Sequence, residues 1–403
     1  MTMERGVDGG AERARAPLDR GRFLRGVGGL AAVSLAGTAP LTAFARGVKG
    51  SGSSGGQLIE RLDRPLDLET PVRYFTTYLT PTDAFFVRSH FGAPDTIDAH
   101  AWRMHVYGEV KSALTVGLTD LRRFEEVSLV STIQCSGNGR AYYTPHPSGV
   151  QWQRGAVSTA KWTGVRLADV LRHAGIGAGA QYVWLRGRDS DPLKTPRFLR
   201  SIPLSVALEP TTILAYKMND EPLPILHGQP LRLIVPGWVA DDQVKWLSEI
   251  QVRSTEALGY FYQAAYRYPN HLGKPGVAVP PTREHPLTLM NVKSLIAYPD
   301  DGRTLTRGLA AIQGVAWSGR ARIVRVDVSV DGGRTYRAAR LGREDTPYAW
   351  RLWSLPYRFD HTGTYTIMAR ATDSAGATQP VTSPWNPSGY LWNGIDSVRV
   401  TVR

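Results

Sequence analysis

Residues 131–140 read Ser-Thr-Ile-Gln-Cys-Ser-Gly-Asn-Gly-Arg and place Cys135, the only cysteine among 403 residues, where a strand-like run ends in a glycine-rich loop. A single buried cysteine usually packs as a small apolar side chain, so its presence alone predicts no site. Its neighbours change this interpretation, because Gly137 and Gly139 let the backbone approach a bulky ligand, and Arg140 favours a thiolate. A soft thiolate suits a transition metal. The stretch therefore indicates a metal-binding cysteine.

The residues around this loop combine short strands with one clear helix. Apolar positions 167, 170, 171 and 174 share one face of a helix that ends at Gly175. Strands are expected at 182–185 and at 231–235, the second of them stopped by Pro236 and Gly237. This mixture predicts an α+β domain over residues 58–281.

The character of the sequence changes after residue 281. Valines at 324, 326, 328 and 330 alternate with polar residues, and Asp331-Gly332-Gly333 follows as a hairpin signal. Positions 365, 367 and 369 alternate in the same way. Short strands at even spacing predict a β-sandwich of the immunoglobulin type over residues 282–403.

The first 45 residues have the composition of an export signal. An arginine-containing start leads into Gly-, Ala- and Leu-rich sequence and ends at Ala43-Phe44-Ala45, a typical cleavage site. Phe23 and Leu24 beside arginines resemble a twin-arginine signal, and the segment is too weakly apolar for a permanent membrane anchor. Residues 46–57, rich in Gly and Ser, are expected to be a flexible linker. The expected location is therefore the periplasm.

Charge and cysteine content limit the possible partners. The formal net charge is +13, yet Lys and Arg are scattered without a basic run, which disfavours nucleic-acid binding. The same positive field would attract a small oxyanion or an acidic redox protein. One cysteine excludes an internal disulfide, an iron–sulfur cluster and a Cys-x-x-Cys-His haem attachment. Electrons from any redox chemistry would therefore leave for another protein.

Several segments together resemble the sulfite oxidase and plant nitrate reductase family. The loop at 135–140 is similar to the family's Cys-Ala-Gly-Asn-Arg-Arg, and residues 85–90 are similar to its Phe-Phe-Val-Arg-Asn-His. Residues 155–171 match its helix-leading stretch, and 214–219, 227–232 and 244–247 follow in family order. The resemblance implies a sulfite-oxidase-type molybdopterin-binding domain, then an immunoglobulin-like dimerisation domain that forms a homodimer.

The resemblance also implies the residues of a site. Cys135 would ligate molybdenum that is held by a single pterin dithiolene. The other catalytic residues would line an oxyanion pocket, and they are Arg88, Arg140, Trp152 and Tyr216. The cofactor would be bound by Phe86, Arg88, His90, Cys135, Ser136, Gly137, Asn138, Ser158, Thr159, His227, Arg232 and Lys245. Arginine offers a fixed fork of donors to a dianion, and a tyrosine can donate its phenolic proton.

Three positions depart from the family pattern. Gly139 replaces one arginine of the loop, and Ser89 replaces an asparagine beside Arg88. Ser388 stands where the family's Trp-Asn-x-Arg-Gly places an arginine that reaches toward the substrate. The anion pocket is therefore expected to be less positive than in the vertebrate enzymes, and a sulfite dehydrogenase or a sulfane dehydrogenase subunit fits as well.

The expected activity is oxidation of sulfite, or a related sulfur oxyanion, to sulfate by oxygen-atom transfer. Without haem in this chain, the electrons would pass to an external cytochrome c or haem subunit. One alternative is a periplasmic molybdopterin reductase of S- or N-oxides. Another is a cofactor-free secreted binding protein that acts through its immunoglobulin-like domain.

Overall fold

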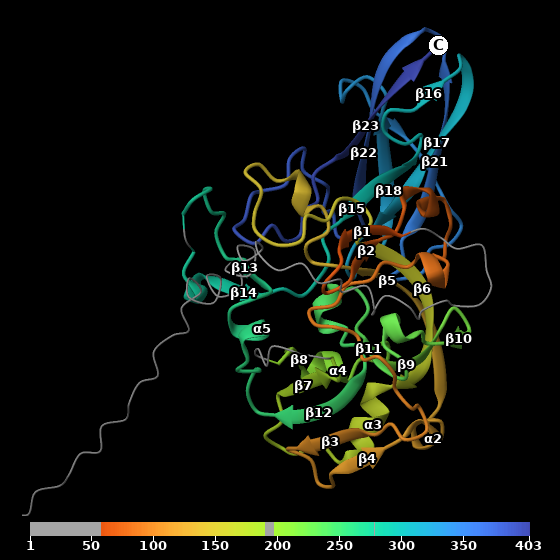
Figure 1. Ribbon diagram of the computed structural model, residues 1–403. Coiled ribbons are helices and arrows are strands. Elements are labelled where there is room, and N and C mark those ends of the chain that lie inside the picture. Colours follow the sequence, from red (N-terminus) through yellow and green to blue (C-terminus); the bar gives the residue numbers. More distant parts are fainter. Residues whose placement is uncertain (1–57, 190–196, 278) are drawn as a thin grey trace, which may run out of the picture. The chain divides into compact units, whose positions relative to one another are not determined.

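The computed structural model describes residues 58–189, 197–277 and 279–403 (Figure 1). The expected export signal, 1–45, and the expected linker, 46–57, lie outside the described residues. Within the described ranges, no helix has the length and apolar character needed to cross a membrane.

An antiparallel five-stranded sheet carries the cysteine loop at one strand end. Its order is β10-β9-β6-β5, with β11 also paired to β9. The strands are β5 (Glu126–Gln134), β6 (Val157–Arg166), β9 (Ile213–Met218), β10 (Glu221–Pro222) and β11 (Arg232–Ile234). At Gly164 of β6 a Cβ would lie 1.9 Å from the Leu214 carbonyl oxygen of β9, so this pairing requires glycine. The loop after β5 is thus fixed by a tightly paired sheet.

A second five-stranded sheet has the order β4-β3-β12-β7-β8, with β3 and β12 parallel. The strands are β3 (Met104–Gly108), β4 (Leu114–Val116), β7 (Tyr182–Gly187), β8 (Leu199–Pro203) and β12 (Leu247–Arg253). Helix α3 (Leu167–Ala174) buries Leu167, Val170 and Leu171 in the apolar cluster that this sheet also lines. The expected helix is confirmed, and it ends at Gly175 with φ of +73°. The strands expected at 182–185 and 231–235 are confirmed as β7 and β11.

Shorter elements connect these sheets. Two small hairpins pair β1 (Ile59–Leu62) with β2 (Asp67–Glu69) and β13 (Arg267–Pro269) with β14 (Glu284–Pro286). The other α-helices in the described ranges are α2 (Leu118–Leu121), α4 (Leu204–Ala207) and α5 (Tyr260–Gln263). Single 3-10 turns occur at Val72–Thr76, Thr82–Ala84, Arg140–Tyr142, Ile225–His227, Ala240–Asp242 and Pro281–Arg283. These turns, rather than long helices, position several polar side chains of the site.

The C-terminal part is a sandwich of two sheets, as expected. One sheet has the order β15-β17-β21-β20 and the other β16-β23-β22-β18-β19. The strands are β15 (Lys293–Tyr298), β16 (Thr304–Leu305), β17 (Gly308–Trp317), β18 (Ile323–Ser329), β19 (Arg337–Ala338), β20 (Arg340–Leu341), β21 (Arg351–Phe359), β22 (Gly363–Asp373) and β23 (Asp396–Val402). One apolar cluster draws side chains from both sheets.

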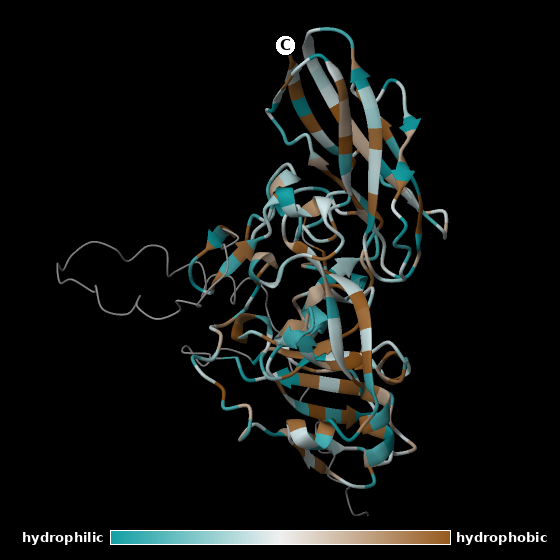
Figure 2. Ribbon diagram, turned by 90° about the vertical axis from the view of Figure 1, so that its right-hand side faces the viewer, coloured by the Kyte–Doolittle hydropathy of each residue, from teal (hydrophilic) through white to brown (hydrophobic). Residues whose placement is uncertain are grey.

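Apolar and polar residues alternate along these sandwich strands, brown against teal in Figure 2. Val326 and Val328 point into the core, and the glycines after Asp331 take positive φ in the turn between β18 and β19. Val324 departs from the expected alternation and is 52% exposed. The register of β18 shifts between Ile323 and Arg325, and such an irregularity re-aims a side chain.

A further apolar cluster joins the sandwich to the rest of the protein. Phe75, Val157 and Val239 pack in one cluster with residues of β15 and β17 from the sandwich. Trp317 of β17 also donates from Nε1 to Gln134 Oε1 of β5, at 2.6 Å. The two parts therefore share a core and are not independent modules.

Candidate functional site

Cys135 begins a tight turn directly after β5. Its N–H donates to the Ala156 carbonyl at 2.9 Å, and its carbonyl accepts from Asn138 N–H at 2.9 Å. Gly139 has φ of +91°, a left-handed conformation that favours glycine. The sulfur-bearing side chain is 6% exposed and lines a cavity. The turn thus presents the thiol to this cavity.

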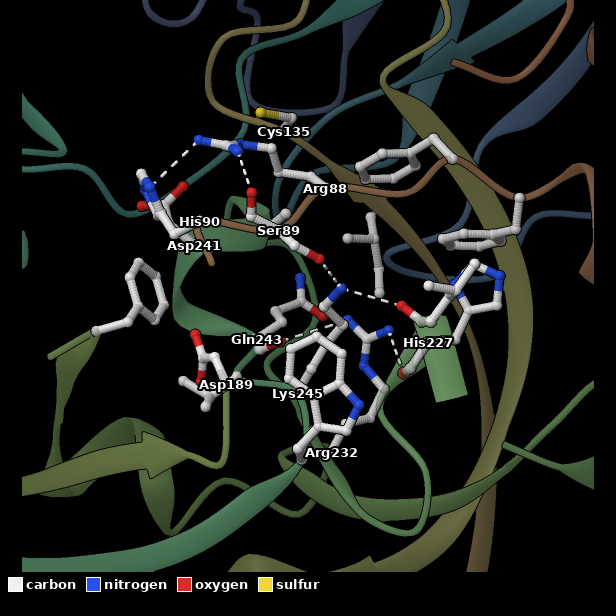
Figure 3. Close-up of a pocket in the computed structure, with 18 of the residues that line it drawn as sticks. Arg88, Ser89, His90, Cys135, Asp189, His227, Arg232, Asp241, Gln243 and Lys245 are labelled. Atoms are coloured by element: carbon white, nitrogen blue, oxygen red, sulfur yellow. Dashed lines mark hydrogen bonds between the residues drawn. The ribbon is translucent and has the colours of Figure 1, made fainter. Parts of the chain in front are cut away.

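The cavity beside Cys135 encloses about 730 Å³ of empty space that opens to solvent. Its lining, most of which is drawn in Figure 3, is Phe85, Phe86, Arg88, Ser89, His90, Ile133, Cys135, Asp189, Phe198, Leu226, His227, Arg232, Ala240, Asp241, Gln243, Val244, Lys245, Trp246 and Tyr266. Two groups of polar side chains are visible, which we call the sulfur end and the cationic end.

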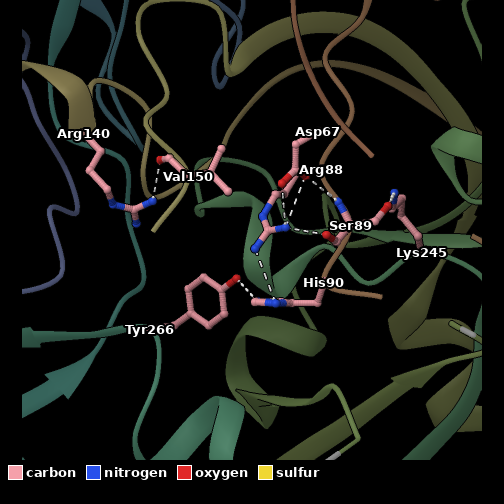
Figure 4. A network of polar contacts seen from close by, with 8 residues as sticks. All are labelled: Asp67, Arg88, Ser89, His90, Arg140, Val150, Lys245 and Tyr266. Atoms are coloured by element: carbon pink, nitrogen blue, oxygen red, sulfur yellow. Dashed lines mark hydrogen bonds and ion pairs between the residues drawn. The ribbon is translucent and has the colours of Figure 1, made fainter. Parts of the chain in front are cut away.

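The sulfur end contains Cys135, Arg88, His90, Asp241 and Tyr266. Burial opposes the charge of Arg88, but Tyr266, Asp67 and Cys135 outweigh it and raise the pKa of this guanidinium, which therefore stays charged. Its Nη1 donates to both carboxylate oxygens of Asp67, at 3.1 and 3.2 Å, as Figure 4 shows. Asp67 thereby holds Arg88 in place.

The proton on His90 can be assigned from its partners. Arg88 Nη2 lies 3.4 Å from His90 Nδ1, and a guanidinium only donates, so Nδ1 accepts and the ring proton sits on Nε2. Burial and the cations Arg88, Arg200 and Arg140 lower the pKa of His90 well below its ordinary value, so the ring is neutral. His90 Nε2 then donates to the Tyr266 oxygen. The phenolic hydrogen of Tyr266 is left to donate elsewhere.

Burial and nearby cations have opposite effects on the Cys135 thiol. Burial raises its pKa, while Arg88, Arg140 and the Gly137 N–H lower it. The balance is a raised pKa in the protein alone. A bound metal cation would favour the thiolate by direct coordination.

The cationic end contains His227, Arg232 and Lys245. Lys245 Nζ donates to Ser89 Oγ at 2.8 Å and to the Leu226 carbonyl at 3.0 Å. Arg232 donates to the carbonyls of His227 and Gln243, at 2.9 and 3.3 Å. The hydrogen bonds of Lys245 and Arg232 therefore lead to uncharged carbonyl and hydroxyl oxygens.

Burial lowers the pKa of Lys245 to about 7, that of Arg232 to about 9 and that of His227 to about 3. Arg232 Nε and Gln243 Oε1 are buried without a hydrogen-bond partner in the described structure. A phosphate would compensate the buried positive charges of this end and could accept a hydrogen bond from Arg232 Nε. The residues therefore fit a phosphorylated cofactor such as molybdopterin, with Cys135 free to ligate its metal.

Arg140 and Trp152 adjoin the cysteine loop but do not line the cavity. Arg140 Nε donates to the Ser388 carbonyl and Nη1 to the Val150 carbonyl, both at 2.9 Å, so its fork points at backbone (Figure 4). Trp152 is fully buried among apolar residues around Cys135. Their expected place in the pocket lining is corrected to a supporting position.

Of the expected cofactor contacts, Phe86 lines the cavity, whereas Ser136, Gly137 and Asn138 of the cysteine loop do not. Ser158 Oγ bonds to Thr70 at 2.7 Å, and Thr159 Oγ1 bonds to Thr132 at 2.5 Å. These two hydroxyls hold neighbouring chain segments together. Neither residue lines the cavity.

Tyr216 is also misplaced by the sequence prediction. Its hydroxyl donates to Glu126 Oε2 at 2.8 Å, and its ring packs in the cluster beneath the second sheet, outside the cavity. Because successive residues of β9 face opposite sides, Ala215 rather than Tyr216 belongs to the cluster around Cys135. The phenol of the cavity is Tyr266.

The sequence analysis missed several polar residues of the site, namely Asp67, Asp189, Asp241, Gln243 and Tyr266. Asp241 and Gln243 directly precede the recognised Val244-Lys245, so chain proximity was an available signal. Tyr266 follows α5 in a segment without periodicity, and nothing in the sequence marked it. Its left-handed φ of +56° turns the chain at the cavity.

The C-terminal segment supports the cysteine loop from behind. Leu391 N–H donates to the Ser136 carbonyl at 2.8 Å, and the Trp392 ring lies where a side chain on Gly139 would be. Lys293 Nζ of β15 donates to the Asn138 carbonyl at 3.4 Å. Residues beyond position 290 thus contribute to the shape of a site formed mainly by earlier residues.

Comparisons with known proteins agree with this geometry. Two family models match the chain: the oxidoreductase molybdopterin binding domain over residues 90–261, and the Mo-co oxidoreductase dimerisation domain over residues 284–403. The crystal structure of the sulfane dehydrogenase SoxCD from Paracoccus pantotrophus is similar, with a TM-score of 0.76 and 26% identity. The match covers 88% of this chain and 92% of that one.

Sequence relatives point the same way. The chain is 38% identical over 363 residues to mitochondrial sulfite oxidase of Homo sapiens, which covers 84% of this chain and 65% of the human protein. It is 36% identical over 348 residues to sulfite oxidase of Gallus gallus, covering 81% of this chain and 74% of the chicken protein. The chain thus spans just under two thirds of the human relative. It belongs to the sulfite oxidase family of molybdopterin-binding oxidoreductases.

Proposed function

We propose that this protein is a molybdenum enzyme that oxidises sulfite, or a related sulfur oxyanion, and passes the electrons to a separate acceptor. The observation that carries the proposal is the thiol of Cys135 in one cavity with the charged Arg88, the basic side chains Arg232 and Lys245, and the neutral ring of His227. A thiolate ligand and a phosphate site at opposite ends of a cavity suit a metal–pterin cofactor. The relatives named above act on sulfite or sulfane sulfur, which motivates the substrate.

In this proposal each end of the cavity has its own task. His227, Arg232 and Lys245 hold the pterin phosphate, and Cys135 ligates the metal. The bound cofactor supplies two-electron redox chemistry with oxygen-atom transfer. Arg88, kept rigid by Asp67, orients an oxyanion by preorganised charge. Tyr266, whose oxygen already accepts from His90, donates its proton to a substrate oxygen.

The test compares purified wild-type protein with Cys135→Ser. Molybdenum and pterin content are measured together with turnover of sulfite in the presence of an artificial one-electron acceptor. We expect stoichiometric cofactor and sulfite oxidation in the wild type, and loss of turnover in the variant at an unchanged melting temperature. Equal activity in a folded Cys135→Ser protein, or wild type without molybdenum, would contradict the proposal.

A reductase of S- or N-oxides remains the second candidate, because the less positive pocket suits a neutral substrate too. The same preparation is therefore assayed with a sulfoxide and a reduced dye. Turnover of the sulfoxide without turnover of sulfite would contradict sulfite oxidation and support the reductase. A protein free of metal and pterin would instead favour a binding function.

We also propose a homodimer formed through the C-terminal sandwich, a cytochrome c or haem subunit as acceptor, and export by residues 1–45. The dimerisation-domain match over 284–403 supports the first of these. Sedimentation analysis, reduction of purified cytochrome c, and N-terminal sequencing of the protein from a periplasmic fraction test the three separately. A monomer in sedimentation would contradict the homodimer, and cytochrome c that is not reduced would contradict the proposed acceptor. An uncleaved protein in the cytoplasm would contradict the proposed export.

A further inference from the structure

The sulfur end also contains a carboxyl group, that of Asp241, to which the proposed function gives no role. Asp241 and Asp242 occupy the 3-10 turn Ala240–Asp242, and both bind the fully buried Arg200 of β8. Arg200 Nη2 lies 2.8 Å from Asp242 Oδ1 and 3.4 Å from Asp241 Oδ2. One guanidinium thus faces two carboxyl groups, and the shorter contact belongs to Asp242.

Asp241 differs from Asp242 in facing the cavity. It belongs to the cavity lining, is 7% exposed, and its Oδ1 has no hydrogen-bond partner in the described structure. Figure 3 shows its carboxyl beside His90, near the guanidinium of Arg88. Ser136 is near enough to lower the pKa of Asp241, but its hydroxyl lies outside hydrogen-bond geometry. Asp241 thus lies at the cavity with one buried carboxyl oxygen whose hydrogen-bonding capacity is not satisfied in the described structure.

The charge at this end is low for a pocket that receives an anion. Arg88 is paired with Asp67, and Arg200 is shared by two carboxyl groups. Arg140 donates to backbone carbonyls, and Ser388 contributes its carbonyl where the resemblance predicts an arginine. An ionised Asp241 would repel an oxyanion at close range in a poorly hydrated cavity.

A protonated Asp241 would have the opposite effect. Burial raises the pKa of this carboxyl against the attraction of Arg200, and the neighbouring Asp242 raises it further. A carboxylic acid kept neutral by its surroundings donates a strong hydrogen bond to an oxyanion. The groups that face Asp241 from the packed elements are Arg88, His90, Cys135, Arg200, Asp242, Tyr266 and Tyr390.

We propose that Asp241 is a specificity-determining residue of the sulfur end, which in its acid form donates its proton in a hydrogen bond to the bound oxyanion. Binding of a sulfur oxyanion is therefore coupled to the uptake of one proton. This proton reaches the site either on the Asp241 carboxyl or on the anion. This inference rests on the proposed function and names the form of its substrate. In this inference the neutral carboxylic acid of Asp241 donates a hydrogen bond to the oxyanion, in a pocket that lacks the arginine expected at position 388.

The test measures protons taken up when sulfate, a stable oxyanion, binds to the purified holoenzyme. Calorimetric titration in buffers of different ionisation enthalpy gives this number at roughly pH 8.5, where a free carboxyl would be ionised. We expect about one proton per sulfate in the wild type and an affinity that falls about tenfold per pH unit in this range. Wild-type binding without proton uptake would overturn the inference, even if sulfite is oxidised.

Two adjacent variants sharpen the test. Asp241→Asn keeps a donor but cannot ionise, so it should bind sulfate without proton uptake and with the same affinity at low and high pH. Asp242→Asn changes the other partner of Arg200, outside the cavity lining, and should keep the wild-type proton uptake. Proton uptake that persists in Asp241→Asn, or disappears only in Asp242→Asn, would assign the effect to another group. The metal and pterin content of each variant shows separately whether the proposed function holds.

Discussion

Tyr266 and Tyr216 show how the position of one residue decides its chemistry. Both phenols are almost fully buried and hydrogen-bonded, but Tyr266 lies in the cavity with His90, whereas Tyr216 bonds to Glu126 outside it. A hydrogen bond to a charged group contributes about 1.5–3 kcal/mol. Tyr266→Phe should therefore lower kcat/KM for sulfite by roughly tenfold to a hundredfold.

Tyr216→Phe is the matched control for this prediction, since it removes the same atom from the other site. Steady-state kinetics at saturating acceptor should show kcat/KM unchanged within about twofold. If Tyr216→Phe loses activity and Tyr266→Phe keeps it, the sequence-based assignment is right and the structural one is wrong.

The sequence predicted the residues of the site that lie in continuous motifs. Arg88, Cys135, His227, Arg232 and Lys245 were expected from such segments, and all five line the cavity. Asp67 and Tyr266 were not found, because each reaches the site only through tertiary folding. A sequence motif contains residues that are adjacent in the chain, whereas a cavity is lined by residues that are adjacent only after folding.

At the scale of elements, the pairing of β6 with β9 depends on the absence of one side chain. A Cβ on Gly164 would lie 1.9 Å from the Leu214 carbonyl oxygen and 2.7 Å from Ala215 Cα. Backbone atoms cannot move aside cheaply, so Gly164→Ala should lower the free energy of unfolding by about 3 kcal/mol. The urea midpoint of unfolding measures this change.

Gly273→Ala provides the control, because a Cβ there would make only ordinary contacts of 3.6 Å or more. Its midpoint should shift by less than about 0.5 kcal/mol. Equal effects of the two substitutions would mean that the close approach of β6 and β9 is not limiting.

Periodicity predicted the elements well where one face is buried and the other is wet. Helix α3 and the turn after β18 follow the expected residues, since their patterns reflect solvent on one side. Periodicity did not predict the 3-10 turns that carry Arg140, His227 and Asp241, because three residues are too few to show a period. Much of the site therefore rests on elements that leave no pattern.

For the whole molecule, the contact between the sandwich and the cysteine loop includes a buried lysine. Lys293 is 1% exposed, and burial lowers its pKa from 10.5 to about 7. Between these two values the unfolded chain holds a proton that the folded protein lacks. The stability of the wild type should therefore rise with pH across this window, and the full cost of burial is present below pH 7.

Methionine has nearly the same volume as lysine, so Lys293→Met removes the free-energy cost of burying a charge at this position. The stability of the variant relative to wild type should be greater at roughly pH 6.5 than at pH 9.5, by at least about 1 kcal/mol. Denaturant unfolding of both proteins at the two pH values measures the difference. A constant difference would show that Lys293 does not titrate in this window.

The hydrogen bond from Leu391 to the Ser136 carbonyl has a consequence for the order of events in the cell. The ribosome makes the cysteine loop long before it makes the segment that supports the loop from behind. A nascent chain cannot complete this support until Leu391 has left the ribosome. Cofactor insertion is therefore expected only after the segment around Leu391 has been made and has folded against the loop.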